Sequence, residues 1–467
     1  MIGITLLIPD GVGARNFLLG AFLPSLAAKG RVQVLHRLPP SALEMVSARA
    51  EIEWEQLIGP KETPARFFLR NALVSAHMYR ADTMAMRFNL RLPINGSWRT
   101  RYGVRVARMV GRAASLSVRA VAALDHLHGG LLRIGGEVDH YRQLLKKFGS
   151  RVLFCSHQRP PSVIPAVLAA RSLRIPTATF IFSWDNLTSK GRIAAPFDYY
   201  FVWSALMRDE LLRYYPQLSP ARIEIVGTPQ FDPYADEALL WSREEFFRRI
   251  GADPRRPLIC YSGGDVTIAP EDAEHVGVLL ELIRAGRIKR APQVLLRPSP
   301  VDDGKRYAEV RARYPELIYA APSWIRQDAS DWASACPTQA DAQFLANLTR
   351  YADLNVNVSS TMTLDFAIHD KPVVNIAFDI ASPPPFGLPL WEHHYRFEHY
   401  RPVIELGAAR FARSPDELAA HINAYLSDPT LDREGRRKLV ELEVMLPLGC
   451  SGERISRAVM RIAAEGE

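Results

Sequence analysis

The sequence has few cysteines and no long hydrophobic run. Its four cysteines, Cys155, Cys260, Cys336 and Cys450, are scattered singly among 467 residues and form no CxxC pair. This spacing excludes a disulfide framework, argues against a structural zinc site and favours a reducing cytoplasm as the setting. No stretch of roughly 18 uncharged apolar residues occurs, so no membrane-spanning helix is expected.

The sequence also lacks targeting and low-complexity segments. The amino terminus, MIGITLLIPDG, has no basic region and no cleavage site, so we interpret it as a buried strand rather than a signal peptide. Hydrophobic residues make up 48% and charged residues 23%, which excludes a mostly disordered or fibrous chain. A chain of this length is expected to form two or three domains.

Positive charge is concentrated in one segment. Residues 61–120 contain twelve lysines and arginines but only two acids, Glu62 and Asp82, so this segment carries a net charge of +10. The whole chain carries +8, so the remaining residues together carry about −2. Such a patch attracts anions, and we expect it to contact an anionic membrane surface. No recognition motif accompanies the charge, so nucleic acid is not an expected partner. The alternative is a set of amphipathic helices with a solvated arginine face.

The first half of the chain alternates between strand and helix patterns. The apolar run ITLLIPD predicts a strand, GVGARN a loop, FLLGAFLPSLAAKG a helix closed by Gly30, and RVQVLHRLP a second strand. Residues 61–145 lack strand signals and predict inserted helices. Further strands are predicted at RVLFCSH, TATFIFSW, DYYFVWS and RIEIVGTPQFD, so a parallel sheet with crossover helices is expected.

The second half repeats this pattern after a charged, proline-containing segment. Strands are predicted at PLICYSGGD, QVLLRPSP, LIYAAP, LNVNVSS and KPVVNIAF, and the tail is predicted to be helical. We therefore expect a first Rossmann-like domain over 1–240 with its helical basic insertion at about 61–145, a second one over 250–440, and a terminal helix over 441–467 that packs back on the first domain. Two such halves joined by a hinge suggest a ligand cleft.

Three predicted strands of the second half end in loops suited to an anion. The strongest is Ser359-Ser360-Thr361, which follows a buried strand and precedes a helix that has Asp365 in its first turn. Free backbone N–H groups and hydroxyls at this point favour a diphosphate; simple N-capping is the alternative. Another strand ends in Arg297-Pro298-Ser299-Pro300, and an arginine can bind phosphate bidentately. The third loop contains Ser262, Gly263, Gly264 and Thr267, where glycines allow close approach of a ligand.

Base candidates follow three strands of the first half. They are Asp10, His157 and Asp185, any of which could take a proton from a hydroxyl. Each also has a structural explanation: Asp10 could cap a helix, Asp185 could form an Asx turn with Asn186, and His157 could be a satisfied strand-end residue. Polar residues near these loops are candidates for binding an acceptor: Gly13, Arg15, Asn16, Trp184 and Asn186.

The order of these motifs resembles the GT-B glycosyltransferases, most closely the surface-polysaccharide branch that includes CDP-glycerol glycerophosphotransferases. The resemblance covers most of residues 150–467. It rests on the Arg297-Pro298-Ser299-Pro300 turn, the Ser359–Thr361 loop with Asp365, and Gly227-Thr228-Pro229-Gln230-Phe231-Asp232, with support from the tail motifs Ser414-Pro415, Leu426-Ser427-Asp428-Pro429 and Gly452-Glu453-Arg454. Ser299 stands where that branch has histidine, which argues against a glycerophosphotransferase.

The resemblance implies two Rossmann-like doubly wound domains facing across a cleft. It implies that the second domain binds a nucleotide sugar as substrate, with no cofactor and no metal, and the absence of an Asp-x-Asp motif at a strand end agrees with this. The first domain would bind a glycan or lipid-linked acceptor and supply the base. We therefore expect a cytoplasmic glycosyltransferase of surface polysaccharide biosynthesis (capsule or lipopolysaccharide), peripheral at the inner face of the membrane.

Two alternatives remain open. Nucleotide-sugar 2-epimerases share the expected fold, but they would need a carboxylate-rich cleft, and the first half offers few acids at strand ends. A non-catalytic protein that docks on membranes or partners through the basic helices is the other. The histidine-rich stretch from Trp391 to Tyr400 lacks a helical ligand register, so we expect it to pack near the cleft rather than to bind a metal.

Overall fold

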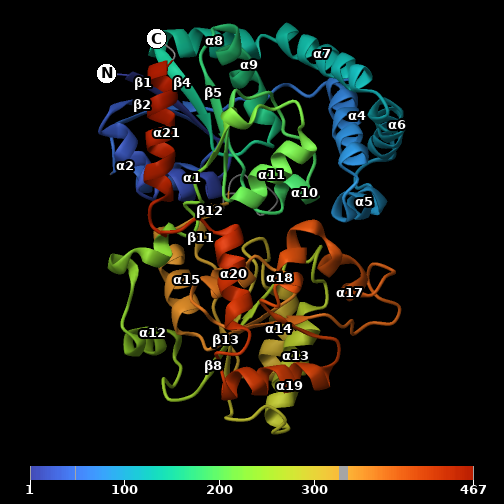
Figure 1. Ribbon diagram of the computed structural model, residues 1–467, viewed down its shortest axis with the longest axis vertical. Coiled ribbons are helices and arrows are strands. Elements are labelled where there is room, and N and C mark those ends of the chain that lie inside the picture. Colours follow the sequence, from blue (N-terminus) through green and yellow to red (C-terminus); the bar gives the residue numbers. More distant parts are fainter. Residues whose placement is uncertain (1, 48, 326–334, 466–467) are drawn as a thin grey trace. The chain divides into compact units, whose positions relative to one another are not determined.

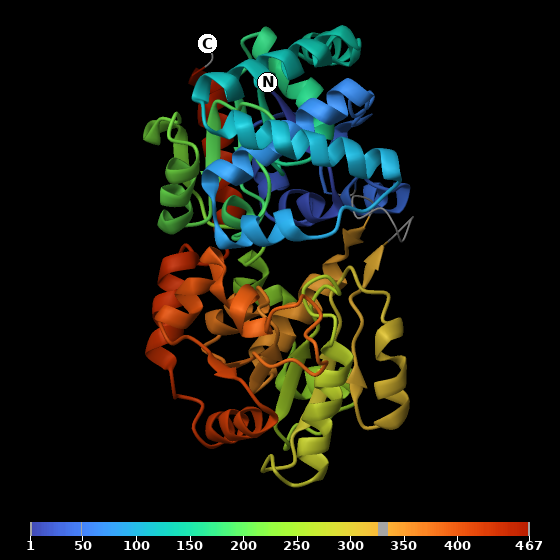
Figure 2. The same cartoon turned by 90° about the vertical axis from the view of Figure 1, so that its right-hand side faces the viewer.

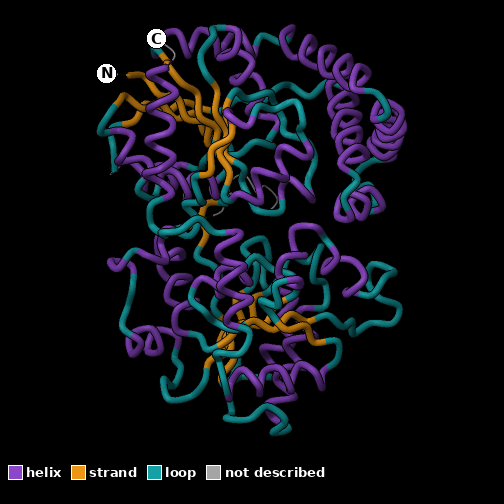
Figure 3. Tube along the Cα trace, viewed as in Figure 1, coloured by secondary structure: helices purple, strands orange, loops and turns teal. Residues whose placement is uncertain are grey.

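Two parallel sheets organise the chain, one in each of two compact units. The computed structural model describes residues 2–47, 49–325 and 335–465. The first unit comprises Met1–Asp232, Ile325–Cys336 and Cys450–Glu467, and the second comprises Pro233–Trp324 and Pro337–Gly449. In each unit helices lie on both sides of the sheet (Figure 3). This arrangement confirms the expected pair of Rossmann-like domains.

The first unit has a seven-stranded parallel sheet in the order β3-β2-β1-β4-β5-β6-β7. Its strands are β1 Ile2–Ile8, β2 Gly30–His36, β3 Ile52–Gln56, β4 Ser150–Cys155, β5 Thr177–Phe180, β6 Tyr199–Val202 and β7 Ile223–Ile225. The chain leaves β1 toward β2 and later returns to β4 on the other side. The carboxyl ends of β1 and β4 therefore form a topological switch point, where open α/β sheets bind ligands.

The first-unit helices largely follow the expected alternation. They are α1 Gly11–Leu18, α2 Phe22–Ala27, α3 Pro40–Ser47, α9 Ile164–Ser172, α10 Asn186–Ser189, α11 Ala205–Tyr214 and α21 Ser451–Glu465, with the insertion helices described below. The terminal helix α21, red in Figure 1, packs against α2 and β4.

The single helix predicted over FLLGAFLPSLAAKG is wrong. GVGARN forms most of α1 instead of a loop, the helix stops at Leu18, α2 follows, and Gly30 begins β2 rather than closing a helix. Asp10 explains the early start, because its carboxylate caps α1. Pro24 explains the interruption, because proline has no backbone N–H and cannot donate the hydrogen bond that would continue α1 through this position.

The basic segment is helical, as predicted. It consists of α4 Pro64–Ala81, α5 Met84–Arg91, α6 Trp98–Ser115, α7 Val118–Ile134 and α8 Glu137–Phe148. Thr63, Thr83, Ser97 and Ser117 each cap the helix that follows, which explains where the first four begin. Figure 2 shows these helices, blue to cyan, at the front of the unit. Gly111 permits close packing of α6 on α4, since a Cβ there would lie 2.5 Å from the Ala72 carbonyl oxygen.

The second unit has a six-stranded parallel sheet in the order β10-β9-β8-β13-β14-β15. Its strands are β8 Leu258–Ser262, β9 Gln293–Arg297, β10 Ile318–Tyr319, β13 Leu354–Asn357, β14 Val373–Ile376 and β15 Arg410–Ala412. This order repeats that of the first unit's β3 to β6, with β8 in the place of β1. The switch point of the second unit therefore lies at the carboxyl ends of β8 and β13.

Helices of the second unit cover this sheet on both sides. They are α12 Arg243–Ile250, α13 Asp272–Arg284, α14 Ala308–Arg313, α15 Gln339–Tyr351, α16 Met362–Ile368, α17 Leu390–His393, α18 Arg401–Glu405, α19 Pro415–Ser427 and α20 Arg433–Glu443. A separate two-stranded sheet pairs β11 (Trp324–Ile325) with β12 (Cys336–Pro337). Within the described ranges, no helix is long and apolar enough to cross a bilayer.

Candidate active site

Asp10 and His157 meet at the switch point of the first unit. Asp10 follows β1 and accepts a hydrogen bond from the Gly13 N–H at 2.8 Å, which caps α1. Its other carboxylate oxygen lies 2.7 Å from His157 Nδ1. The loops after β1 and β4 are in close contact, because a Cβ on Gly13 would lie 2.4 Å from Ser156 Oγ. Both predicted base candidates therefore belong to one cluster.

The other ring nitrogen of His157 differs from Nδ1 in its surroundings. Its Nε2 is buried and lacks a hydrogen-bond partner among the residues that the structure describes, while the ring stacks on Phe182 with centroids 3.9 Å apart. Burial lowers the pKa of His157 more than the neighbouring Asp10 raises it. The neutral ring keeps its proton on Nδ1, facing the carboxylate, so Nε2 presents a lone pair, as a general base requires.

Asp185, the third base candidate, has several partners of its own. Ser189 Oγ donates to it at 2.7 Å, Asn186 Nδ2 donates at 3.2 Å, and Lys190 Nζ lies 3.6 Å away. The side chain thus holds the short helix α10 and its flanks together. These contacts favour the structural explanation, and catalysis by Asp185 stays a prediction.

The predicted acceptor-binding residues are tied into the first unit. The Gly13 N–H is bonded to Asp10, Arg15 Nε donates to Asn16 Oδ1 at 2.9 Å, and Asn16 is buried. Trp184 is also buried, and Asn186 Oδ1 accepts from Gln158 Nε2 at 3.1 Å. The contacts described above are all with other residues of the first unit, so binding of an acceptor by these residues stays a prediction.

Gln158 and Phe182 are part of this cluster but were not predicted. Gln158 Oε1 accepts the Phe182 N–H at 3.0 Å, and its Nε2 holds Asn186. The stacking of Phe182 on His157 depends on this placement. Gln158 directly follows His157 in sequence, which was the available signal.

The three predicted anion loops of the second unit are adjacent. Ser262 at the end of β8 lies opposite Arg297 of β9 on one side and Asn357 of β13 on the other. The Gly263 N–H donates to the Arg297 carbonyl oxygen at 2.8 Å. The loops at 262–267, 297–300 and 359–361 therefore leave one edge of one sheet side by side.

The Ser359–Thr361 loop has a distinctive backbone. Ser359 adopts φ +39°, in the left-handed region, and its N–H donates to the Tyr395 hydroxyl at 3.2 Å. Ser360 N–H donates to Asn357 Oδ1 at 3.0 Å, and Ser360 Oγ accepts from Met362 N–H at 3.2 Å. Ser360 Oγ thus bonds the first N–H of α16, whereas Thr361, the N-cap residue, makes no side-chain capping bond. The side chains of Ser359, Ser360 and Thr361 remain partly exposed.

Tyr395 and Tyr400, from the histidine-rich stretch, form hydrogen bonds with residues at this edge of the sheet. Tyr395 donates to the Ile376 carbonyl oxygen at 2.5 Å, and Tyr400 donates to Asn375 Oδ1 at 2.7 Å. Both hydroxyls are buried, so the stretch packs within the second unit. Among the residues described, no group of three or more histidine, cysteine or acidic side chains could hold a metal.

Two of the predicted phosphate-site residues form buried contacts instead of facing open space. Arg297 is 7% exposed and donates to both oxygens of Asp341, at 2.9 and 3.0 Å. Asp365 is buried and accepts a hydrogen bond from Tyr234. The charge of Arg297 is therefore already balanced, and a direct contact of Arg297 with phosphate stays a prediction.

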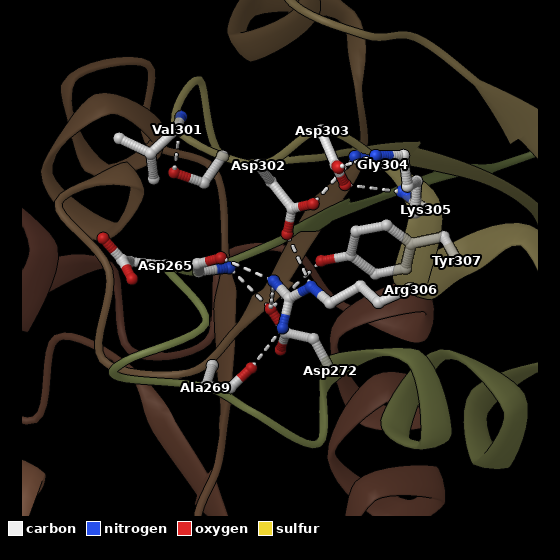
Figure 4. A network of polar contacts seen from close by, with 12 residues as sticks. Asp265, Ala269, Asp272, Val301, Asp302, Asp303, Gly304, Lys305, Arg306 and Tyr307 are labelled. Carbon is white, nitrogen blue, oxygen red and sulfur yellow. Dashed lines mark hydrogen bonds and ion pairs between the residues drawn. The ribbon is translucent and has the colours of Figure 1, made fainter. Parts of the chain in front are cut away.

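A polar network around Arg306 holds the glycine loop in place (Figure 4). Arg306 donates to the carbonyl oxygens of Gly264 and Ala269, at 2.7 and 2.5 Å, and to Asp302 Oδ2 at 2.5 Å. Asp272 accepts the Gly264 N–H at 2.6 Å. The network links the loop after β8 to the loop after β9. Sequence reasoning missed it, because neither Arg306 nor Asp272 stands beside a recognised motif.

Two further predicted residues of these loops form local turns. Thr267 donates to Asp265 Oδ1 through its N–H at 2.7 Å and its hydroxyl at 2.8 Å. Ser299 Oγ accepts the Val301 N–H at 3.5 Å. Their contact with a ligand stays a prediction.

Comparison with known proteins places the fold. No protein-family model matches the chain, and no curated protein is similar to it in sequence. Among solved structures, UDP-GlcNAc 2-epimerase from Neisseria meningitidis, bound to UDP-GlcNAc, is 10% identical with a TM-score of 0.52, covering 99% of this chain and 100% of its own. The corresponding epimerase from Methanocaldococcus jannaschii is 11% identical with a TM-score of 0.51, covering 98% and 99%.

A glycosyltransferase from Rickettsia africae ESF-5 is also similar. It is 10% identical with a TM-score of 0.50, covering 100% of this chain and 98% of its own. At such identities the likeness shows the fold alone. Together with the two sheets described above, it shows that the chain has the GT-B fold.

Proposed function

We propose that this protein is a glycosyltransferase that moves a sugar from a nucleotide-sugar donor to a hydroxyl of a glycan or lipid-linked acceptor. The observation that carries the proposal is the Asp10–His157 pair. A buried histidine with one nitrogen held by a carboxylate and the other without a partner in the described part of the chain is arranged to accept a proton. It lies at the switch point of the first sheet, where this fold class binds ligands.

The proposed step is a displacement at the anomeric carbon. The acceptor oxygen forms a bond to that carbon while His157 Nε2 takes the hydroxyl proton. The bond from the anomeric carbon to the diphosphate oxygen breaks, and the nucleoside diphosphate leaves with the electron pair. Asp10 keeps the Nδ1 proton in place and stabilises the imidazolium that forms. This chemistry describes an inverting transfer.

The donor would bind at the second unit's switch point. Support comes from three loops that leave one sheet edge together, two of which are rich in glycine or hydroxyl groups. The partly exposed Ser359, Ser360 and Thr361 would donate hydrogen bonds to the diphosphate. The Arg306–Asp272 network would preorganise the glycine loop, since it fixes both the N–H and the carbonyl oxygen of Gly264.

A 2-epimerase is the second candidate, because two of the similar folds reported above are epimerases. The two activities separate cleanly without an acceptor. An epimerase converts a nucleotide sugar alone, whereas a transferase releases nucleoside diphosphate only when an acceptor hydroxyl is supplied. Release that depends on both substrates, lost in His157→Ala, is the expected result.

Association with an anionic membrane surface at the inner face of the cell membrane is proposed for helix α6. Its exposed side chains include Trp98 at 67%, Met109 at 71% and Leu116, which follows the helix, at 89%. Exposed arginines alternate with them: Arg99, Arg101, Arg105 and Arg112. Apolar side chains inserted between cations are typical of interfacial helices. This surface would bring a lipid-linked acceptor of surface polysaccharide biosynthesis within reach.

A further inference from the structure

A cavity of about 270 Å³ lies inside the first unit, beside the candidate active site. Its walls come from helices α4 and α7 of the insertion and from two segments of the Rossmann core, 159–164 and 191–194. Leu73, Val74 and Ile164 form an apolar side. The volume suits a group of about one sugar ring rather than a whole oligosaccharide or a lipid tail.

The polar side of the cavity is strongly basic. Arg70, Arg159, Arg192 and His128 line it, and no acidic side chain is among its lining residues. Arg70 and Arg192 pair with Glu62 and Asp125, whose carboxylates are 42% and 48% exposed. Those acids therefore lie toward solvent, and the arginines bring positive charge to the cavity.

Arg159 lacks such a partner. None of the described acidic side chains forms an ion pair with it, although the charges of Asp185 and Asp10 act on it. Burial lowers the pKa of its guanidinium, and that of His128 falls to about 4 because of burial and the nearby Arg192. Arg159 is half-buried, and a half-buried cation without an ion-pair partner favours a ligand that supplies the opposite charge.

Arg159 also links the cavity to chemistry, since it stands two residues after His157. The charge of Arg159 acts on His157, so a group bound by Arg159 would lie within electrostatic reach of the imidazole that is proposed to activate the acceptor. We propose that this cavity binds an oxyanion of the acceptor, a phosphate or a carboxylate on its terminal sugar, and so positions the adjacent hydroxyl for His157. The role in positioning an acceptor rests on the proposed glycosyltransferase function, whereas binding of an oxyanion in the cavity can be measured without it.

The test is calorimetric titration of the full chain with three probes: methyl phosphate, methyl glucuronide and neutral methyl glucoside. Arg159→Gln and Arg192→Gln are the test variants. Arg213→Gln, exposed on α11, is the matched control. We expect at least one anionic probe to bind, with affinity lowered at least about tenfold in both test variants and unchanged in this control.

Which anionic probe binds identifies the source of the oxyanion. Equal binding of the neutral probe, or unchanged anion binding in both test variants, would overturn the proposal. Urea unfolding gives a second readout: Arg159→Gln should keep or raise the unfolding midpoint, because it removes a half-buried cation that has no ion-pair partner. A lower midpoint would assign Arg159 to the fold instead. Nucleotide titration of the same samples tests the donor site separately, so failure of the function is not mistaken for failure of the cavity.

Discussion

His157 Nδ1 lies 2.7 Å from the carboxylate of Asp10, although the two residues are 147 positions apart in the chain. Strand order brings them together, because β1 and β4 are neighbours at the centre of the first sheet. Asp10 also caps α1, so one carboxylate fixes both a helix start and an imidazole. Proton transfer by the proposed route depends on this pairing.

Replacing either member of the pair should slow transfer without unfolding the protein. We expect His157→Ala to lower kcat by about 10²–10⁴-fold, the usual contribution of a general base. Asp10→Asn should lower kcat as well, while asparagine still caps α1. Steady-state kinetics with nucleoside diphosphate release would measure both. Full activity of His157→Ala would remove the histidine from the mechanism.

The pH dependence gives a sharper test of the same pair. Burial lowers the pKa of His157 below its usual value, so the neutral base should persist and the rate should hold below pH 6.5. Asp10 opposes this shift, so removing its charge in Asp10→Asn should move the acid limb of the profile to still lower pH. An acid limb that moves upward would contradict the assignment.

The donor loop is tested by Ser360→Ala with Thr361→Ala. This variant should bind nucleotides more weakly, because it removes hydroxyl donors at the end of β13. Loss of the bond from Met362 N–H to Ser360 Oγ should also cost about 0.5–1.5 kcal/mol of stability. Thermal shift and calorimetry separate the two effects. Unchanged nucleotide affinity would move the donor site elsewhere.

Buried charge in the second unit predicts a strong stability effect. Arg297 and Asp341 form a pair in which both side chains are 7% exposed. Asp341→Ala leaves the guanidinium buried and unpaired, so it should lower the free energy of unfolding by about 3–5 kcal/mol. Denaturant unfolding measures this. Replacing both residues with apolar ones should cost less than Asp341→Ala alone; an equal or larger cost would contradict an ion-pair explanation.

The α6 surface is tested with vesicles. Replacing Arg99, Arg101, Arg105 and Arg112 by glutamine should lower association with anionic vesicles at low salt, since each nearby cation contributes about 1 kcal/mol. Replacing Trp98 and Met109 by serine should weaken the part of the binding that survives high salt. Co-sedimentation measures both. Binding that neither change affects would assign membrane contact to another surface or to none.

Much of the fold could be predicted from the sequence, because buried runs such as Ile2–Ile8 and Leu258–Ser262 are continuous apolar strands. Asp10 and His157 were both recognised as candidates, yet their contact depends on strand order, which no local pattern encodes. Partners distant in sequence also decided what was missed. The sequence around Arg297 predicts a phosphate ligand, but the structure pairs this arginine with Asp341, which lies 44 residues later in the chain.

Local geometry also limited how much of the fold could be predicted from the sequence. The helix expected over 17–30 follows from its apolar content, but Pro24 and the capping by Asp10 determine where α1 and α2 begin. The Arg306–Asp272 network likewise joins two loops through residues with no motif of their own. Such contacts follow from packing rather than from residue type.

The most direct measurement is titration of the full chain with a panel of nucleotides and nucleotide sugars, without acceptor, followed by NMR of the sugar. We expect one nucleotide sugar to bind saturably, His157→Ala to bind it equally well, and the sugar to stay chemically unchanged. Absence of binding by every nucleotide, or inversion of the sugar at its second carbon, would contradict it.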